Sequence, residues 1–417
     1  MTSAPSDSLI IIRGRGRVSA LGTALPNPEP LESPFQTREL QDRLVAVGSV
    51  PPAVEDALQH LRRHDAPYRQ LDRTVLLALL AARQATAEAG WLPQPGSPAS
   101  SLTADNQPPA PTLSVSIGSS RGATGRLEQF HEEFLSGGAV AAAASPLTTL
   151  GNVASWVAYD AGTTSGGALS HSSTCSSAFQ ALGNAVAWLR AGMAERFLAG
   201  GTEAPLTDFT LAQMQALGIY SPFAAAEFPC RPGAGRPSTF VLGEGAAVFA
   251  LEKICRSALA AERAGQPHAP VFCLEGVGFG FEAIGSKTGL SPDGQHFQTA
   301  MREALRQANV AAETVDAVVL HSPGTPAGDA AERQALRAVF GQNLPDLVSN
   351  KWCLGHTLGA SAALSLDFAC HILTTQVWPA PSFATDLTPT PSRPIRRVLI
   401  NAAGFGGNAA SALVSVV

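Results

Sequence analysis

The sequence has few charged residues and no strong excess of either sign. Charged side chains make up 15% of the 417 residues, and the formal net charge is −5. Proteins that bind nucleic acid or an anionic membrane surface through electrostatics carry a basic excess, so we expect neither kind of partner here. An acidic protein partner would need a local basic patch, which the overall composition does not locate.

Long hydrophobic runs are also missing. The first run, residues 9–12, is followed by arginines at positions 13, 15 and 17. No window of about 18 uncharged apolar residues occurs elsewhere, and a membrane-spanning helix needs roughly that length. The sequence therefore predicts neither a signal peptide nor a membrane span, and we expect a cytoplasmic protein.

Cysteine and lysine are scarce. The six cysteines lie far apart with no CxxC pair, which argues against a structural zinc site and is typical of reduced core cysteines in a large cytoplasmic protein. Of the 28 basic residues, only Lys253, Lys287 and Lys351 are lysines. The surroundings of each lysine are therefore informative.

Apolar and small residues are abundant. Hydrophobic residues make up 45% of the chain, which also has 39 glycines, so a large interior with close backbone approaches is expected. The length predicts two fused halves, 1–255 and 256–417, in which strands and helices alternate as in an α/β fold with mixed sheets. Strands are expected at 9–18, 113–118, 168–172, 196–200, 245–253, 271–278, 317–320, 398–401 and 411–416. Helices are expected at 71–90, 124–135, 176–190, 257–264, 298–308, 330–340 and 357–374, and a surface loop rich in Pro, Ser and Gly at 92–112.

One cysteine stands at a position suited to nucleophilic catalysis. Cys175 lies in the segment HSSTCSSA, between the strand expected at 168–172 and the helix expected at 176–190. The helix N-terminus favours the thiolate, and small neighbours leave room for a thioester next to a backbone N–H that can stabilise an oxyanion. The alternative is a buried, inert cysteine, which is how we interpret the other five.

Two histidines occupy the same kind of strand-to-helix loop. His321 ends a predicted strand, and His356 follows Lys351 in the segment NKWCLGH. Neutral imidazoles can hydrogen-bond a thioester oxygen and stabilise an enolate, and Lys351 could hold one of them, with Asp329 or Glu332 as its partner. Each histidine alone is more often an ordinary core or surface residue. Their joint pattern with Cys175 favours an active site.

A glycine-dense turn follows the strand near the C-terminus. In NAAGFGGN, residues 401–408, the glycines allow backbone N–H groups to approach an anion or oxyanion. Phe405 stands between Gly404 and Gly406, where its ring could act as a gate. The turn is not a dinucleotide fingerprint, since the GxGxxG spacing is missing.

With these motifs in order, the chain resembles the β-ketoacyl synthases of fatty-acid and polyketide assembly, in the elongating Cys-His-His branch. The resemblance covers nearly the whole chain. The matching segments are residues 174–178, 199–204, 240–246, 321–329, 350–356 and 404–407.

The resemblance implies a five-layered αβαβα thiolase fold of two similar halves, usually dimeric, with an identical or related subunit. It implies that Cys175 accepts an acyl chain from an acyl carrier protein. His321 and His356 would stabilise the enolate formed when malonyl-carrier loses CO₂, and no metal or organic cofactor is expected. The backbone N–H groups of Cys175 and Phe405 would form the oxyanion hole, flanked by Gly404 and Gly406.

The remaining site residues are implied to support the histidines. Lys351 with Glu332 would order them, and Asp329 and Thr325 belong to the same motif.

Several positions depart from the family pattern. Ser322–Pro323 stands where Gly-Thr is usual, Ala403 where Phe is usual, and Thr174 where Ala is common, while Phe179 is bulky near the nucleophile. These departures point to a specialised polyketide or polyene enzyme. Two other interpretations stay open: a non-catalytic partner subunit that sets chain length, and a thiolase-like enzyme acting on coenzyme A esters.

Overall fold

The computed structural model describes residues 8–25, 32–91, 112–150, 152–163, 165–264, 270–283, 285 and 290–417. The surface loop expected at 92–112 lies outside the described residues except for its last one.

Ten strands form a mixed sheet that is bent between two five-stranded halves. The strand order is β10-β9-β11-β12-β8-β1-β7-β6-β4-β5, and the halves meet where β1 pairs with β8 through Ile11–Cys273 and Ile12–Phe272. The strands are β1 (Ser8–Val18), β4 (Leu113–Gly118), β5 (Ala168–His171), β6 (Arg196–Glu203), β7 (Gly245–Cys255), β8 (Phe272–Phe281), β9 (Ala317–Val319), β10 (Asp346–Val348), β11 (Arg397–Gly404) and β12 (Asn408–Val416). A separate hairpin is formed by β2 (Gln36–Leu40) and β3 (Arg43–Val47).

Helices cover both outer faces and fill the space between the two halves of the sheet. The helices are α1 (Pro52–His64), α2 (Arg73–Glu88), α3 (Thr124–Gly137), α4 (Ala144–Thr148), α5 (Asn152–Asp160), α6 (Ser177–Ala191), α7 (Asp208–Ala216), α8 (Arg256–Arg263), α9 (Gln295–Ala308), α10 (Pro326–Phe340), α11 (Lys351–Leu354) and α12 (Ser361–Thr375). Short 3-10 helices include η4 (Leu358–Ala360).

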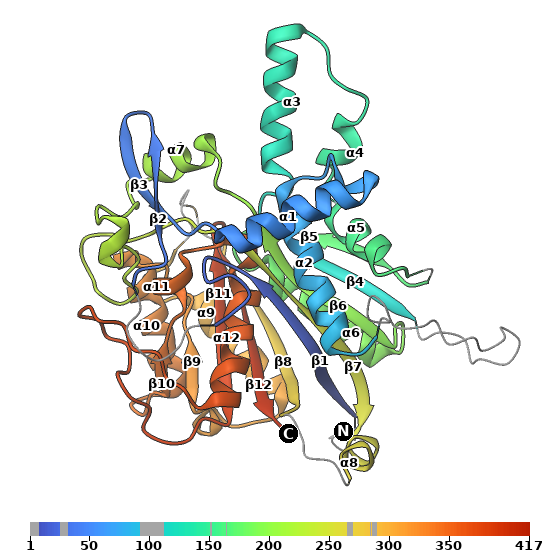
Figure 1. Ribbon diagram of the computed structural model, residues 1–417. Helices are drawn as coiled ribbons and strands as arrows, with labels where there is room; N and C mark the ends of the chain where they lie inside the picture. Colours follow the sequence, from blue (N-terminus) through green and yellow to red (C-terminus); the bar gives the residue numbers. More distant parts are fainter. Residues whose placement is uncertain are drawn as a thin grey trace, which may run out of the picture.

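Three apolar cores define five layers (Figure 1). One core joins α1, α2 and α5 to the N-terminal strands, and another joins α9 and α10 to the C-terminal strands. The largest core lies between the halves, where α6 and α12 pack against each other and against both sets of strands. Strands covered on both faces are apolar along their whole length, as in Ala246–Leu251. The α/β fold with mixed sheets and five αβαβα layers is therefore confirmed.

The stretch formed by η4 and α12 is the one described stretch whose composition resembles a membrane span. Residues 358–375 are long and apolar enough to cross a bilayer, but 83% of that window is buried inside the protein. The chain places this helix in the middle layer, so its apolar character serves the core.

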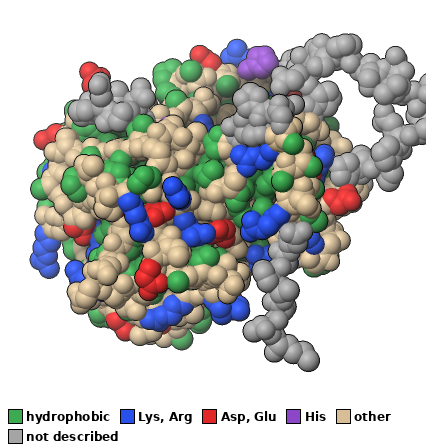
Figure 2. Space-filling view, turned by 90° about the horizontal axis from the view of Figure 1, so that it is seen from below, with side chains coloured by type: hydrophobic (Ala, Val, Ile, Leu, Met, Phe, Trp, Pro, Cys, Tyr) green, Lys and Arg blue, Asp and Glu red, His purple; other side chains and the backbone are tan. Residues whose placement is uncertain are grey.

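The face of the molecule that carries the chain ends is shown in Figure 2. Among the described side chains visible there, Lys and Arg are interspersed with Asp, Glu and apolar groups. This mixture forms no patch of one sign on the visible surface, in line with the nearly balanced composition.

Candidate active site

Cys175 lies on a sharp turn between β5 and α6. Thr174 adopts a positive φ of 55°, and Ser176 caps the helix, so the chain reverses direction around the cysteine. The first turn of α6 approaches the sheet closely because Gly118 faces it without a side chain. A Cβ on Gly118 would lie 2.2 Å from the carbonyl oxygen of Ser177. The turn brings Cys175 into a pocket while α6 anchors it in the central core.

Burial controls the state of the thiol. It raises the pKa of Cys175 to about 12, with a further increase from the nearby carboxylate of Glu203, while Lys351 and Arg121 act in the opposite direction. Burial therefore outweighs the contribution expected from the helix tip, and the thiol of the resting protein is protonated. A helix terminus contributes roughly 0.3–1 kcal/mol, which is smaller than the cost of burying a thiolate.

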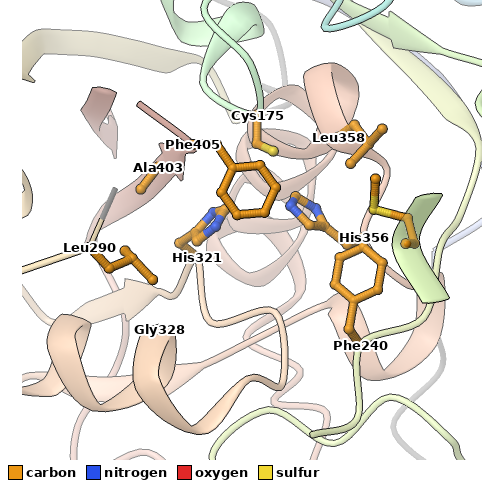
Figure 3. A pocket seen from close by; sticks show the side chains of 11 residues that line it. Cys175, Phe240, Leu290, His321, Gly328, His356, Leu358, Ala403 and Phe405 are labelled. Carbon is orange, nitrogen blue, oxygen red and sulfur yellow. The ribbon is translucent and has the colours of Figure 1, made fainter. Parts of the chain in front are cut away.

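The two histidines face each other in the same pocket. The ring centroids of His321 and His356 are 5.2 Å apart, with an interplanar angle of 83°. Figure 3 shows the two imidazoles on either side of the Phe405 ring and below the sulfur of Cys175. Burial and then the charge of Lys351 hold both histidine pKa values well below 6.5. Both rings are therefore neutral at pH 7.

Glu332 fixes the backbone that carries His321. Its buried carboxylate accepts hydrogen bonds from the backbone N–H groups of His321 and Ser322, both at 2.8 Å. It also accepts from the Ser322 hydroxyl at 2.7 Å and from the side-chain amide of Asn401 at 3.0 Å. The sequence did not single out Asn401 as a supporting residue, because one asparagine within a buried strand has no distinctive pattern.

Lys351 supports the histidines in a different way from the one expected. Its buried ammonium group donates to the carbonyl of Leu320 at 3.2 Å, next to His321. Burial lowers its pKa to about 8, and Glu332 opposes this shift through space. Within the described residues, neither Glu332 nor Asp329 forms an ion pair with it. The predicted direct pairing of Lys351 with a carboxylate is therefore not found, because Glu332 is occupied by backbone donors.

Asp329 and Thr325 shape the loop after His321. Asp329 accepts from the backbone N–H groups of Gly233 at 2.8 Å and Gly324 at 3.2 Å, and burial raises its pKa to about 6. Thr325 is the residue before α10, and its carbonyl accepts from the N–H of Asp329 at 2.9 Å. Both residues lie behind the pocket and outside its lining.

The glycine turn between β11 and β12 packs against the nucleophile. A Cβ on Gly404 would lie 1.8 Å from the hydroxyl oxygen of Thr174 and 2.8 Å from the backbone nitrogen of Cys175, so only glycine fits. The backbone N–H groups of Cys175 and Phe405 make no backbone hydrogen bond within the described part of the chain. Phe405 is 42% exposed at the pocket wall, and Gly406 continues the turn with φ 85° without lining the pocket.

The rest of the pocket is apolar. Its cavity of about 60 Å³ is completed by residues that the sequence did not single out as pocket residues, since apolar side chains in helices and loops look like ordinary core residues. They are Met214, Phe240, Leu290, Gly328 and Leu358, together with Ala403, which was noted only as a departure from the family pattern. Among the described residues, no three His, Cys, Asp or Glu side chains converge as a metal site.

Two family domains match the chain. The β-ketoacyl synthase N-terminal domain matches residues 38–254, and the C-terminal domain matches residues 271–382. The chain belongs to the β-ketoacyl synthase family.

Relatives match over nearly their full length. Nodulation protein E of Rhizobium sp. (strain N33) is 29% identical, with 96% of this chain and 97% of that protein covered. The 3-oxoacyl-[acyl-carrier-protein] synthase 2 of Staphylococcus aureus (strain COL) is 25% identical, with 96% of each covered. The solved ishigamide ketosynthase/chain length factor superposes with a TM-score of 0.79 at 22% identity, covering 98% of this chain and 99% of that one. This structural likeness shows a shared ketosynthase fold.

Proposed function

We propose that this protein is a β-ketoacyl synthase that joins an acyl chain to malonyl-carrier protein by decarboxylative condensation. The observation that carries the proposal is the pocket in which Cys175 meets two neutral imidazoles, His321 and His356. The name of the 3-oxoacyl-[acyl-carrier-protein] synthase relative supports the reaction class and a carrier protein as partner.

In the first half-reaction, the sulfur of Cys175 forms a thioester with the acyl group. The sulfur attacks the acyl-carrier thioester, the carrier leaves as a thiolate, and that thiolate takes up the proton which Cys175 gives up. Because the cysteine is protonated at rest, a neutral imidazole in the same pocket is the available base for this proton. The backbone N–H groups of Cys175 and Phe405, which make no backbone hydrogen bond among the described residues, are suited to hold the tetrahedral oxyanion.

In the second half-reaction, malonyl-carrier loses CO₂, and the electron pair of the broken bond forms an enolate. The enolate carbon attacks the Cys175 thioester, and the Cys175 thiolate leaves and takes up a proton from solvent water. His321 and His356 would donate hydrogen bonds to the enolate oxygen, which suits a reaction that develops negative charge in an apolar pocket. The product is a 3-ketoacyl-carrier.

The surroundings of His356 favour the tautomer that this role needs. Its Nδ1 atom is buried without a hydrogen-bond partner among the described residues. An orphaned N–H is rarer than an orphaned acceptor, so the proton belongs on Nε2. The backbone around the ring is fixed, since the N–H of His356 donates to Val241 at 2.7 Å and its carbonyl accepts from Gly243 at 3.1 Å.

A second subunit is proposed to pair with the edge strand β5. This strand ends the sheet and pairs only with β4 among the described strands, which leaves one row of its backbone groups available. Helix α3 stands out from the body (Figure 1) and exposes Leu127, Phe134 and Leu135. An identical or related subunit would cover both features, as the solved ketosynthase/chain length factor pair suggests.

A second candidate function is that of a non-catalytic subunit that sets chain length. It is favoured by the structural likeness to a ketosynthase/chain length factor pair. Cys175, His321 and His356 are all present and share one pocket, and a subunit without catalysis needs none of them there. We therefore place this function second.

A reconstituted condensation separates the two candidates. Purified protein is mixed with acyl-carrier and malonyl-carrier, and 3-ketoacyl-carrier and CO₂ are measured. Wild type should form both products, and His356→Ala should be acylated at Cys175 yet release at least tenfold less CO₂. If wild type forms no product alone but stimulates a related ketosynthase, and His356→Ala does so equally well, the second candidate replaces the first.

A further inference from the structure

One buried carboxylate near the pocket belongs to none of the steps above. Glu203 is the last residue of β6 and is fully buried. Its two oxygens accept four hydrogen bonds, from the hydroxyl of Ser119 at 3.0 Å and the backbone N–H groups of Ser120 at 2.6 Å, Arg121 at 3.0 Å and Gly359 at 2.9 Å. Burying a carboxylate costs free energy unless hydrogen-bond donors surround it. The four donors therefore offset the cost of burying Glu203.

The donors come from two segments that are far apart in the sequence. Ser119, Ser120 and Arg121 form the turn after β4, whereas Gly359 belongs to η4. The two segments touch backbone to backbone, since a Cβ on Gly359 would lie 2.3 Å from the backbone nitrogen of Ser120. Glu203 therefore joins these segments at a contact that has no room for further side chains.

The turn after β4 leads to the nucleophile. The backbone N–H of Ser119 donates to the carbonyl of His171 at 2.9 Å, and the hydroxyl of Ser172 donates to the carbonyl of Ser120 at 3.1 Å. His171 and Ser172 begin the turn that carries Cys175.

The other segment leads to the imidazole. Gly359 comes three residues after His356, and Leu358 between them lines the pocket. Leu358 has a positive φ of 43°, so this short connection is held in an unfavourable conformation. The hydrogen bond from Gly359 to Glu203 fixes its far end.

We propose that Glu203 is a positioning residue of this active site, which holds the Cys175 turn and the His356 turn at a fixed separation. The expected effect of Glu203 on activity rests on the proposed condensation. The hydrogen bonds that join the two turns do not depend on which substrate is bound. Removing the carboxylate frees both turns at once, so acyl transfer and CO₂ release should both decrease, each by about tenfold.

The charge of Glu203 gives the proposal a signature that a purely structural role lacks. Burial raises the pKa of Glu203 to about 7, so its negative charge appears between pH 6 and 8. Around Cys175, that charge opposes thiolate formation, while Lys351 and Arg121 favour it. The two imidazoles in the pocket stay neutral over this range.

The test is the rate at which iodoacetamide alkylates Cys175, measured by peptide mass spectrometry from pH 6 to pH 9. Exposed Cys255 in the same chain reports the reactivity of the reagent itself. Glu203→Gln should react at about the wild-type rate at pH 6 and about threefold faster or more at pH 9, since removing the negative charge lowers the pKa of Cys175 and so raises its thiolate fraction. A rate ratio that stays constant across this range overturns the proposal.

Asp367→Asn is the matched control, because Asp367 is equally buried and binds Arg15 and Arg17 away from the pocket. It should leave the alkylation profile of Cys175 unchanged. The same rise in Asp367→Asn would show that general loosening causes the effect, and the proposal would fail.

Two milder variants keep the proposal testable if Glu203→Gln does not fold. Ser119→Ala removes one of the four donors and should lower both partial reactions about threefold. Ser172→Ala removes one of the two hydrogen bonds that lead to the nucleophile turn and none on the His356 side, so it should slow acylation about threefold and leave CO₂ release unchanged. Equal effects of Ser172→Ala on both reactions, or none in either variant, contradict the proposal. If wild type itself is not acylated at Cys175, the proposed condensation fails, whereas the alkylation profile still tests Glu203.

Discussion

Replacing Lys351 with methionine should stabilise the protein at neutral pH while impairing its chemistry. The ammonium group is buried, and its pKa falls from 10.5 to about 8 because burial disfavours the charge. That difference corresponds to about 3 kcal/mol at roughly 1.4 kcal/mol per pH unit. Methionine removes this penalty but leaves the carbonyl of Leu320 without its donor, which costs about 1–2 kcal/mol. The variant should therefore unfold with a free energy about 1–2 kcal/mol higher at pH 7.

The sign of this effect should depend on pH. Lys351 has a lower pKa in the folded protein than in the unfolded one, so its charge destabilises the folded state. This penalty is complete below about pH 8 and disappears as the pH rises toward 10.5. Urea unfolding, monitored by tryptophan fluorescence, should show the advantage of Lys351→Met shrinking and then reversing over that range. The exposed Lys253→Met is the control and should change stability by less than about 0.5 kcal/mol at every pH.

Lys351→Met should lower the rate of catalysis although it stabilises the protein. Without the positive charge beside His321, CO₂ release from malonyl-carrier should drop about tenfold or more. If Lys351→Met is less stable than wild type at pH 7, and this loss of stability does not vary with pH, Lys351 does not carry a buried charge that costs stability in the folded protein.

Three further predictions concern other parts of the pocket. Glu332→Gln should lower the free energy of unfolding by about 2–4 kcal/mol in urea titrations, because the carboxylate serves four donors, and an unchanged midpoint would contradict this. Ala403→Phe should reduce acylation by long acyl-carriers about tenfold more than by short ones, since Ala403 lines the pocket; equal losses would place the acyl chain elsewhere. CO₂ release should not fall as the pH drops from 8 to 6.5, because the pKa values of His321 and His356 lie well below 6.5 and Lys351, with a pKa of about 8, only gains charge over this range; a decline centred near 6.5 would show that the rings titrate normally.

The sequence predicted most of the framework because buried strands and amphipathic helices carry periodic apolar patterns. It missed the hairpin β2–β3, whose turn places Gln41 and Asp42 at positive φ where glycine or asparagine is the usual signal. It also predicted one helix over 357–374, whereas the chain forms η4 before α12. The break follows from the tertiary contact of Gly359 with Glu203, which no local pattern contains.

The motifs identified the polar residues of the pocket but did not predict their pKa values or hydrogen-bond partners. Cys175, His321 and His356 line one cavity, as the spacing of strand-to-helix loops suggested. The pKa of the thiol depends on burial and on Glu203, which sequence position does not reveal. The same holds for Lys351, whose bond to a backbone carbonyl replaces the expected carboxylate.

The most direct test of the account is intact-protein mass spectrometry after brief mixing with an acyl-carrier. Wild type should gain the mass of one acyl group, and peptide mapping should place it on Cys175. Cys353→Ser, which alters a buried cysteine outside the pocket lining, should gain the same mass, and Cys175→Ala should gain none. An acyl group on any other residue, or full acylation of Cys175→Ala, would contradict the account.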